Sequence, residues 1–262
     1  MMKNKIIYSC ILLMLVAILV TSILILYKNL KEEKIQQNEF EKLEEIIIED
    51  DKKEEIKEHK KEIVNNNYKI KEQEKVINLG NLYSKNKDLV GWIKIKNTNI
   101  NYPVMKNKDF YLRRNFNKEY SYYGTPFLAE YCDIKSSDNL IIYGHNMKSG
   151  TMFADLIKYK NYNYYKNHKY IELYTLDNNE TIKNDYKIIY CFKTTADSKG
   201  FNFYDYYKFD NEEELNVFKE NCKRLSFFNT NEDISLSDKL ITLSTCEYSN
   251  KNGRMIVVAK KI

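Results

Sequence analysis

The sequence is poor in the residues that mark repetitive, disulfide-rich or metal-binding proteins. Seven glycines and two prolines among 262 residues exclude collagen-like and proline-rich low-complexity architectures. The five cysteines, at positions 10, 132, 191, 222 and 246, form no CxxC pair, so neither a disulfide framework nor a zinc site is expected. No acidic cluster indicates a metal ion, and we expect no metal and no other cofactor.

The residues that are abundant describe a globular domain. Hydrophobic residues make up 43% of the chain and aromatic residues 14%, which is enough for a core and excludes a wholly disordered chain. The net charge of +5 is mild, and no cluster of arginine and aromatic residues predicts a nucleic-acid partner. A weakly basic surface suits a position near an anionic cell envelope.

A long apolar run stands near the N-terminus, after the short tail of residues 1–5. Residues 6–27 contain no charged side chain, and as a helix they would span about 33 Å, enough to cross a bilayer core. The run is longer than the apolar part of a usual signal peptide, and no A-x-A-like site follows it. We therefore expect a retained transmembrane signal anchor rather than a cleaved signal. Lysines flank both ends in nearly equal number, so the flanks alone do not set the orientation.

Residues 28–75 have a different composition. They hold 12 lysines and 15 acidic residues, without any glycine or proline. This pattern predicts a charged helical stalk or linker between the membrane and a folded domain. A partner-binding coiled coil is the alternative, although the heptads are not sustained.

The segment 76–262 has the pattern of a β-rich domain with flanking helices. Strand-like runs occur at 91–95, 100–105, 125–130, 140–143, 171–175, 181–192, 240–244 and 255–260. Helical patterns occur at 76–90, as one or two helices, at 151–159 and at 211–225. Short strands separated by polar turns predict an antiparallel barrel or sandwich. The last helix is amphipathic, with Leu215, Phe218, Cys222 and Leu225 on one face.

Three chemically capable residues follow or begin strand-like runs. Cys246 ends one such run before a polar loop, a position typical of a nucleophile, although a free cysteine is more often a buried apolar side chain. Of the three histidines, His145 is the one that follows a strand end, where it could lower the thiol pKa. Arg254 would return beside the thiol in a hairpin and hold carbonyls or an oxyanion. The alternative for Arg254 is a surface ion pair, with Glu247 as its partner.

These residues resemble a known family. The segment 242–246, TLSTC, matches the TLxTC signature of sortases, the transpeptidases that attach proteins to Gram-positive cell walls. Arg254 matches the arginine of that family, and residues 142–146, IYGHN, resemble the segment around its histidine. The segment 144–153, GHNMKSGTMF, and the long helix before the cysteine strand are most similar to class B.

The resemblance implies both a fold and an activity. The fold would be α+β: a closed sortase-type barrel of about eight strands with N-terminal helices and a helix inserted before the cysteine strand. The activity would be that of a membrane-anchored cysteine transpeptidase. Such an enzyme cleaves a C-terminal sorting motif of the NPxTx type after Thr, keeps the protein as a thioester, and transfers it to a peptidoglycan amine. The partners would be surface proteins, the cell wall and the membrane, with the N-terminus cytoplasmic and the catalytic domain outside.

The resemblance also assigns roles to residues. Cys246 would be the nucleophile, His145 the acid that protonates the leaving amine, and Arg254 the residue that positions the substrate and stabilises the oxyanion. Ser244, Thr245 and Glu247 would lie beside the bound peptide. If thiol and imidazole keep ordinary pKa values, their ion pair is a minor state at neutral pH, which predicts a bell-shaped pH dependence of activity.

Two other interpretations of the residues stay open. The first is another cell-wall cysteine enzyme, such as an L,D-transpeptidase or an amidase, but the His-Gly-x segment that closely precedes the cysteine in those enzymes is absent here. The second is a membrane-tethered binding module in which Cys246 is incidental. Such a module would cut no peptide bond.

Overall fold

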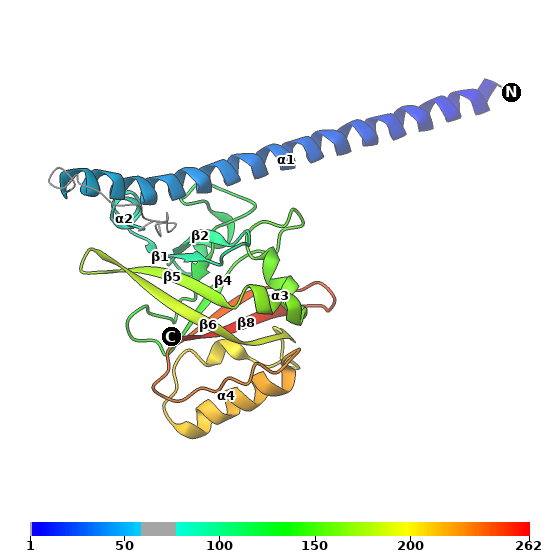
Figure 1. Ribbon diagram of the computed structural model, residues 1–262. Helices are drawn as coiled ribbons and strands as arrows, with labels where there is room; N and C mark the ends of the chain where they lie inside the picture. Colours follow the sequence, from blue (N-terminus) through cyan, green and yellow to red (C-terminus); the bar gives the residue numbers. More distant parts are fainter. Residues whose placement is uncertain (1, 59–76) are drawn as a thin grey trace. The chain divides into compact units, whose positions relative to one another are not determined.

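The computed structural model describes residues 2–58 and 77–262. The chain forms two compact units, of which the first ends at Lys42 and the second is Leu43–Ile262. The first unit is part of one long helix, α1 (Met2–Glu58), drawn in blue in Figure 1. Its large apolar side chains between Ile7 and Tyr27 are exposed. By length and composition this helix can cross a membrane, which is consistent with the predicted anchor.

The second unit is built on a closed barrel with the strand order β1-β2-β3-β4-β7-β8-β6-β5. The strands are β1 (Leu89–Lys94), β2 (Asn101–Met105), β3 (Phe127–Leu128), β4 (Asn139–Tyr143), β5 (Tyr170–Asp177), β6 (Glu180–Thr195), β7 (Leu240–Cys246) and β8 (Gly253–Lys261). The helices are α2 (Gly80–Lys85), α3 (Tyr162–Asn167) and α4 (Glu212–Leu225), with 3-10 turns η1 (Phe110–Arg113), η2 (Ala154–Lys160) and η3 (Phe203–Asp205). The predicted α+β class with a closed barrel of eight strands is confirmed.

Two details differ from the sequence-based expectation. The sheet is mixed, because β2 pairs with β3 and β4 with β7 in parallel. The helical pattern expected over 76–90 is wrong at both ends, since residues 77–79 are not helical, α2 spans Gly80–Lys85 only, and Leu89 already pairs with Met105 in β2. Leu89 and the next strand residues have buried partners across the sheet, and this tertiary pairing overrides a short local helical pattern.

Aromatic and branched side chains fill the barrel and its flanks. Trp92 and Phe192 are fully buried, and the indole of Trp92 donates a hydrogen bond of 2.7 Å to Asn101. A buried indole keeps its large apolar area out of water while its N–H stays paired. The strands that carry the candidate site therefore rest on a well-packed interior.

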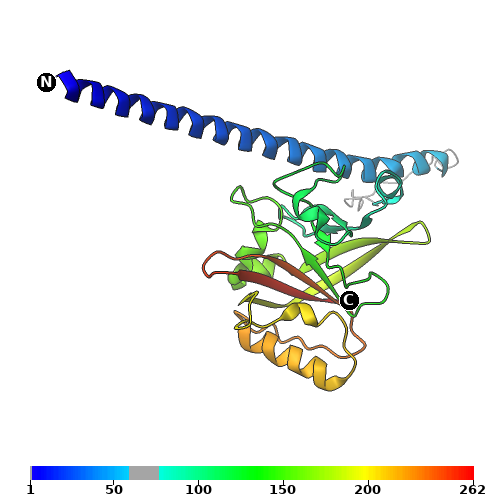
Figure 2. The ribbon, with the colours of Figure 1, turned by 180° about the vertical axis from the view of Figure 1, so that it is seen from behind.

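Helix α4 fixes the segment that leads into β7. It starts at the Asn211 cap, whose side chain accepts a hydrogen bond of 2.9 Å from the Glu214 amide. Of the predicted apolar face, Leu215, Phe218 and Cys222 are buried, and Leu225 at the end of the helix is half-buried. Figures 1 and 2 show α4 beside the barrel, where it packs on β6.

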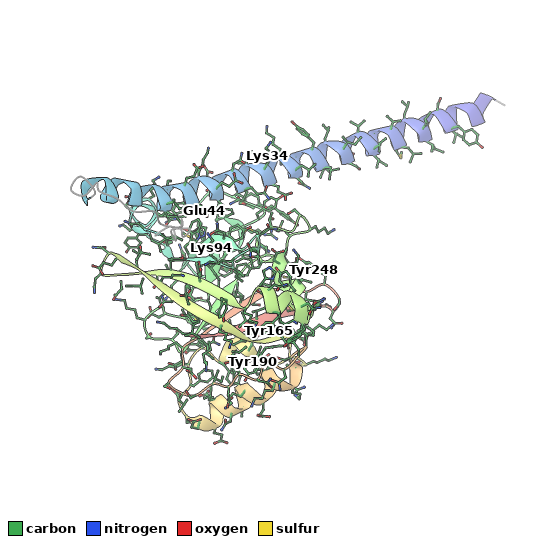
Figure 3. The ribbon with its side chains drawn as sticks, in the orientation of Figure 1. Lys34, Glu44, Lys94, Tyr165, Tyr190 and Tyr248 are labelled. Carbon is green, nitrogen blue, oxygen red and sulfur yellow. The ribbon has the colours of Figure 1, made fainter. Side chains whose placement is uncertain are left out.

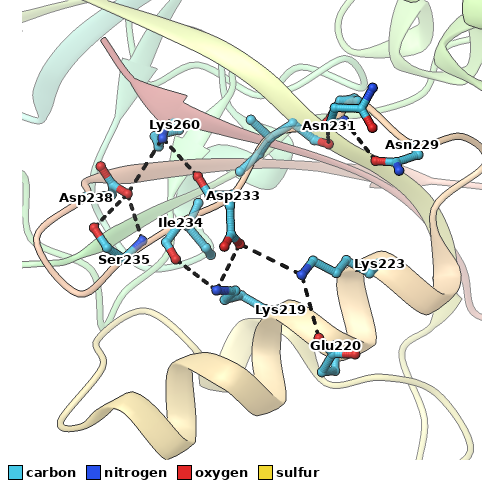
Figure 4. A network of polar contacts seen from close by, with 12 residues as sticks. Lys219, Glu220, Lys223, Asn229, Asn231, Asp233, Ile234, Ser235, Asp238 and Lys260 are labelled. Atoms are coloured by element: carbon cyan, nitrogen blue, oxygen red, sulfur yellow. Dashed lines mark hydrogen bonds and ion pairs between the residues drawn. The ribbon is translucent and has the colours of Figure 1, made fainter.

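Polar contacts then join α4 to the chain ahead of β7 (Figure 4). The ammonium of Lys219 lies 2.9 Å from the Asp233 carboxylate and donates to the Ile234 carbonyl at 3.1 Å. Lys260 of β8 donates to the Asp233 carbonyl at 2.9 Å. Asp233 thus links the helix to the strand pair that carries Cys246 and Arg254.

The described end of the predicted stalk belongs to the second unit. From Leu43 onward α1 packs within that unit, and Ile47 is fully buried, with its carbonyl accepting from the Asn78 amide at 3.1 Å. Glu44 lies 3.6 Å from Lys94 of β1 (Figure 3). Residues 59–75 of the predicted stalk lie outside the described residues, and the stalk stays a prediction.

Candidate active site

Two parallel strands bring the candidate histidine and cysteine to one edge of the barrel. In the β4–β7 pair, Tyr143 lies opposite Ser244. His145 lies two residues after Tyr143, and Cys246 lies two residues after Ser244 at the end of β7. Neighbouring strands lie about 4.8 Å apart, so the register sets these two residues next to each other although they are far apart in the sequence.

Side-chain hydrogen bonds join the end of β7 to the residues that follow β4. The Thr245 hydroxyl donates to the Gly144 carbonyl at 2.7 Å. The Asn146 amide donates to the Cys246 carbonyl at 2.8 Å. The segment that carries His145 and the strand that carries Cys246 are therefore joined to each other by hydrogen bonds next to both residues.

The antiparallel β7–β8 pair adds the arginine. Arg254 is the direct partner of Cys246 in the register, as the predicted hairpin requires. Its guanidinium donates to the Gly253 carbonyl at 3.0 Å. The carboxylate of Glu247 pairs with Lys160 at 2.7 Å, so the alternative of a Glu247–Arg254 ion pair is not what the structure has.

The other thiols of the barrel unit differ from Cys246 in burial. Cys132, Cys191 and Cys222 are buried, whereas Cys246 is half-exposed. Burial raises the pKa of Cys132 to about 11 and raises those of Cys191 and Cys222 well above the ordinary value. These three thiols stay protonated at neutral pH and act as apolar core side chains.

The His145 imidazole has a defined hydrogen bond. Its Nε2 lies 2.8 Å from the Leu112 carbonyl oxygen, and because a carbonyl only accepts, Nε2 carries the proton. Burial lowers the pKa of His145, the bond to Leu112 opposes that shift, and the positive charge of Arg113 adds to it. The ring is therefore neutral at pH 7, with the lone pair on Nδ1.

The three residues expected beside the peptide are all buried. Thr245 uses its hydroxyl for the Gly144 bond. Glu247 is 5% exposed, and its second oxygen accepts from the Ser249 hydroxyl at 2.5 Å. Ser244 is 1% exposed, and its hydroxyl has no hydrogen-bond partner among the residues that the structure describes. Peptide contact by these three residues stays a prediction.

The lowered pKa of the Glu247 carboxyl predicts that the stability of the fold falls in acid. Burial alone would raise the pKa of its carboxyl, but the hydrogen bonds from Lys160 and Ser249 outweigh it and lower the pKa from 4.5 to about 2. A lowered pKa stabilises the fold above pH 4.5, and this contribution is lost as pH falls toward 2. Glu247→Gln should thus cost about 3 kcal/mol at pH 7 and progressively less between pH 4.5 and 2.

Denaturant unfolding of the full chain in detergent, followed by circular dichroism across this pH range, measures that difference. Glu232→Gln is the matched control, because it breaks the ion pair of Glu232 with Lys187, whose side chains are 26% and 30% exposed. Exposed pairs contribute little. An equal cost for both variants, or a cost of Glu247→Gln that does not depend on pH, would contradict the assignment.

Further residues at this edge were not found from the sequence. The Arg113 guanidinium donates to the Tyr122 carbonyl at 2.8 Å and lies 4.8 Å from the Tyr122 ring centre. Tyr248, on the β7–β8 loop, is 71% exposed and donates to the Asn146 carbonyl at 3.2 Å (Figure 3). Tyr248 is close to Cys246 in the sequence. No sequence motif marks Arg113, which is brought to the site only by the fold.

Within the described ranges, no group of three or more His, Cys, Asp or Glu side chains gathers that could hold a metal ion.

A closed barrel of this topology with a half-exposed cysteine opposite an arginine is the arrangement of a cysteine transpeptidase domain. The family model for the sortase domain matches residues 93–262. Sortase B of Staphylococcus aureus (strain NCTC 8325 / PS 47) is 35% identical over 182 residues, which cover 68% of this chain and 71% of that protein. The crystal structure of Clostridium perfringens sortase B has a TM-score of 0.63 and 35% identity, covering 70% of this chain and 98% of its own.

A Staphylococcus aureus sortase B–substrate complex superposes with a TM-score of 0.69 at 30% identity, covering 88% of this chain and 98% of that one. This chain belongs to the sortase family and, within it, to class B. It is a cysteine transpeptidase of the cell-wall anchoring type.

Proposed function

We propose that this enzyme cleaves a sorting motif of the NPxTx type after Thr and joins the protein to a peptidoglycan amine. The observation that carries the proposal is the register that sets Cys246 opposite Arg254 and beside the segment of His145. A thiol, a proton carrier and a fixed cation at one strand edge are the groups that acyl transfer through a thioester needs.

The first half-reaction forms the acyl-enzyme. His145 takes the thiol proton of Cys246 on Nδ1, the resulting thiolate attacks the carbonyl carbon of the motif threonine, and a C–S bond forms. Arg254 offsets the charge on the carbonyl oxygen. The C–N bond then breaks, the leaving amine takes a proton from His145, and a thioester remains. The Glu247 amide already donates to the Gly253 carbonyl at 2.9 Å, so a main-chain donor to the oxyanion comes from another residue.

The second half-reaction reverses these roles. The acceptor amine attacks the thioester carbon, passes its proton to His145, and Cys246 leaves as the thiolate. A solved structure of sortase B in complex with a triglycine peptide supports a glycine-type amine as a model acceptor. We therefore choose triglycine as the test nucleophile.

The test mixes the full chain in mild detergent with NPxTx peptides, with and without triglycine, and identifies the products by mass spectrometry. We expect cleavage after Thr, an acyl adduct on Cys246, and a triglycine-linked product. A peptide with Thr replaced by Ala is the control and should stay intact. Cleavage that never yields the amine-linked product would leave a hydrolase, and no cleavage of any motif peptide would refute the proposed substrate class.

We further propose that residues 6–27 anchor the enzyme in the cell membrane, with residues 1–5 in the cytoplasm and the barrel outside. The apolar composition of this part of α1 and the extracellular position of the acceptor support this orientation. The same peptide assay on intact cells carrying the chain tests it. Product formation only after cell lysis would place the barrel on the inside.

A further inference from the structure

The loop of residues 110–114, which contains the 3-10 turn η1, is held next to His145 by an unbroken series of hydrogen bonds. The carbonyls of residues 111–114 each accept one. The donors are, in order, the Thr125 amide at 2.9 Å, the His145 imidazole at 2.8 Å, the Ser121 amide at 3.0 Å and the Thr125 hydroxyl at 2.9 Å. Three of the four bonds fasten the loop to residues 121–125, and the carbonyl of Leu112 is the one directed to the imidazole.

The close contact between these two segments depends on Gly124. Its φ of +60° lies in the region that favours glycine. A Cβ at this position would lie 2.6 Å from the Leu112 oxygen and 2.7 Å from the Tyr111 oxygen, closer than such atoms approach. A side chain at position 124 therefore forces either the backbone of residue 124 or the carbonyls of Tyr111 and Leu112 to shift, and the second of these carbonyls holds His145.

Arg113 fastens the same loop from its outer side. Its guanidinium bonds to the Tyr122 carbonyl at 2.8 Å and stacks over the Tyr122 ring. The charge of Arg113 also disfavours a second proton on His145. Other titratable groups at this edge include Tyr122, Cys246, Arg254 and Tyr248.

We propose that Gly124 is a positioning residue for the reaction: it seats the Leu112 carbonyl so that His145 keeps its proton on Nε2 and presents Nδ1 to Cys246. The hydrogen bond at one ring nitrogen sets which nitrogen is free for proton transfer. The fixed loop also sets the direction of the ring. The proposal rests on His145 being the proton carrier of the proposed function.

The experiment compares Gly124→Ala with the wild-type full chain in detergent. Histidine-selective ¹⁵N NMR reports the tautomer of each ring, and the chain has three histidines, so the His145 signal is assigned by its loss in His145→Gln. We expect the wild type to show the Nε2–H form and the variant to show a mixture of tautomers. Because a misplacement of about 1 Å costs about a hundredfold in rate, kcat of the variant should fall by about 10- to 100-fold while KM changes less than about twofold.

Gly150→Ala is the matched control. Gly150 also has a positive φ, of +88°, but the nearest atom to an added Cβ is the Asn99 amide nitrogen at 3.9 Å. It therefore carries the same kind of backbone strain without touching the Leu112 loop. We expect its His145 tautomer and kcat to stay close to those of the wild type.

Three results would overturn the proposal: an Nδ1–H tautomer in the wild type, an unchanged tautomer and kcat in Gly124→Ala, or an equal loss in both glycine variants. The first of these is measured on the wild type and needs no variant that folds. If the wild type has the expected tautomer but cleaves no motif peptide, the proposed substrate is wrong and the positioning proposal stands on the NMR result.

Discussion

Replacement of Cys246 by alanine is expected to abolish both cleavage of the motif peptide and formation of the acyl adduct. Alanine has no group that can form the thioester, so kcat/KM should fall by at least about a thousandfold. Cys246 is half-exposed at the end of β7, so the change leaves no cavity in the core and the fold should be kept. Mass spectrometry of the product peptides and of the protein itself measures both losses, and circular dichroism checks the fold.

Cys10→Ala is the control for this prediction. Cys10 is the other cysteine that is exposed, and it lies in α1, so its loss should leave the activity unchanged. Residual cleavage by Cys246→Ala at more than about a thousandth of the wild-type kcat/KM would mean that another group attacks the peptide.

Replacement of His145 by alanine has the second-largest expected effect. A positioned acid or base contributes about 10²- to 10⁴-fold, so kcat/KM should fall within that range. The pH profile separates a lost proton carrier from a damaged fold. Burial and the charge of Arg113 lower the pKa of His145 below 6.5, although the bond to Leu112 opposes that shift. The acid limb of the wild-type profile should therefore lie below pH 6.5, and it should be absent from the variant.

The expected shape of the pH profile follows from which protonation state of the Cys246–His145 pair is the minor one. With its pKa lowered, His145 loses its proton before the pH reaches 7, and the thiolate–imidazolium pair becomes a small fraction of the enzyme. A bell-shaped profile with a low maximum is expected. His168→Ala is the control, since the His168 ring bonds to the Tyr164 carbonyl at 2.8 Å, away from the Cys246 edge. A flat profile of the wild type between about pH 6 and 9 would refute the ion-pair assignment.

Much of the fold was readable from local patterns. Each of the eight strands of the barrel overlaps a run of strand-like residues, because short runs rich in apolar and β-branched residues between polar turns mark strands in a sequence. Helix α4 was recognisable from its apolar face. The closure of the barrel was expected only through the resemblance to sortases, and its two parallel pairings were not expected, since strand neighbours far apart in the chain are chosen by packing and not by local propensity.

The site shows the same division. Cys246, His145 and Arg254 could be named from the TLSTC segment, the strand end at Tyr143 and the hairpin spacing. The loop that holds His145 could not be found in this way, because residues 110–124 carry no motif and act through main-chain carbonyls. Every residue has a main-chain carbonyl, so the residue types do not show which carbonyl will be directed at His145.

The sequence by itself determined which side chains can do the chemistry and which segment can enter a membrane. Residue type fixes a thiol, an imidazole, a guanidinium and a run without charge, and none of these depends on the fold. Only the tertiary structure decided their state. It buried Cys132, Cys191 and Cys222, it placed the proton of His145 on Nε2 through Leu112, and it lowered the pKa of Glu247 to about 2. Burial, charge and hydrogen-bond partners come from segments that meet only when the barrel closes.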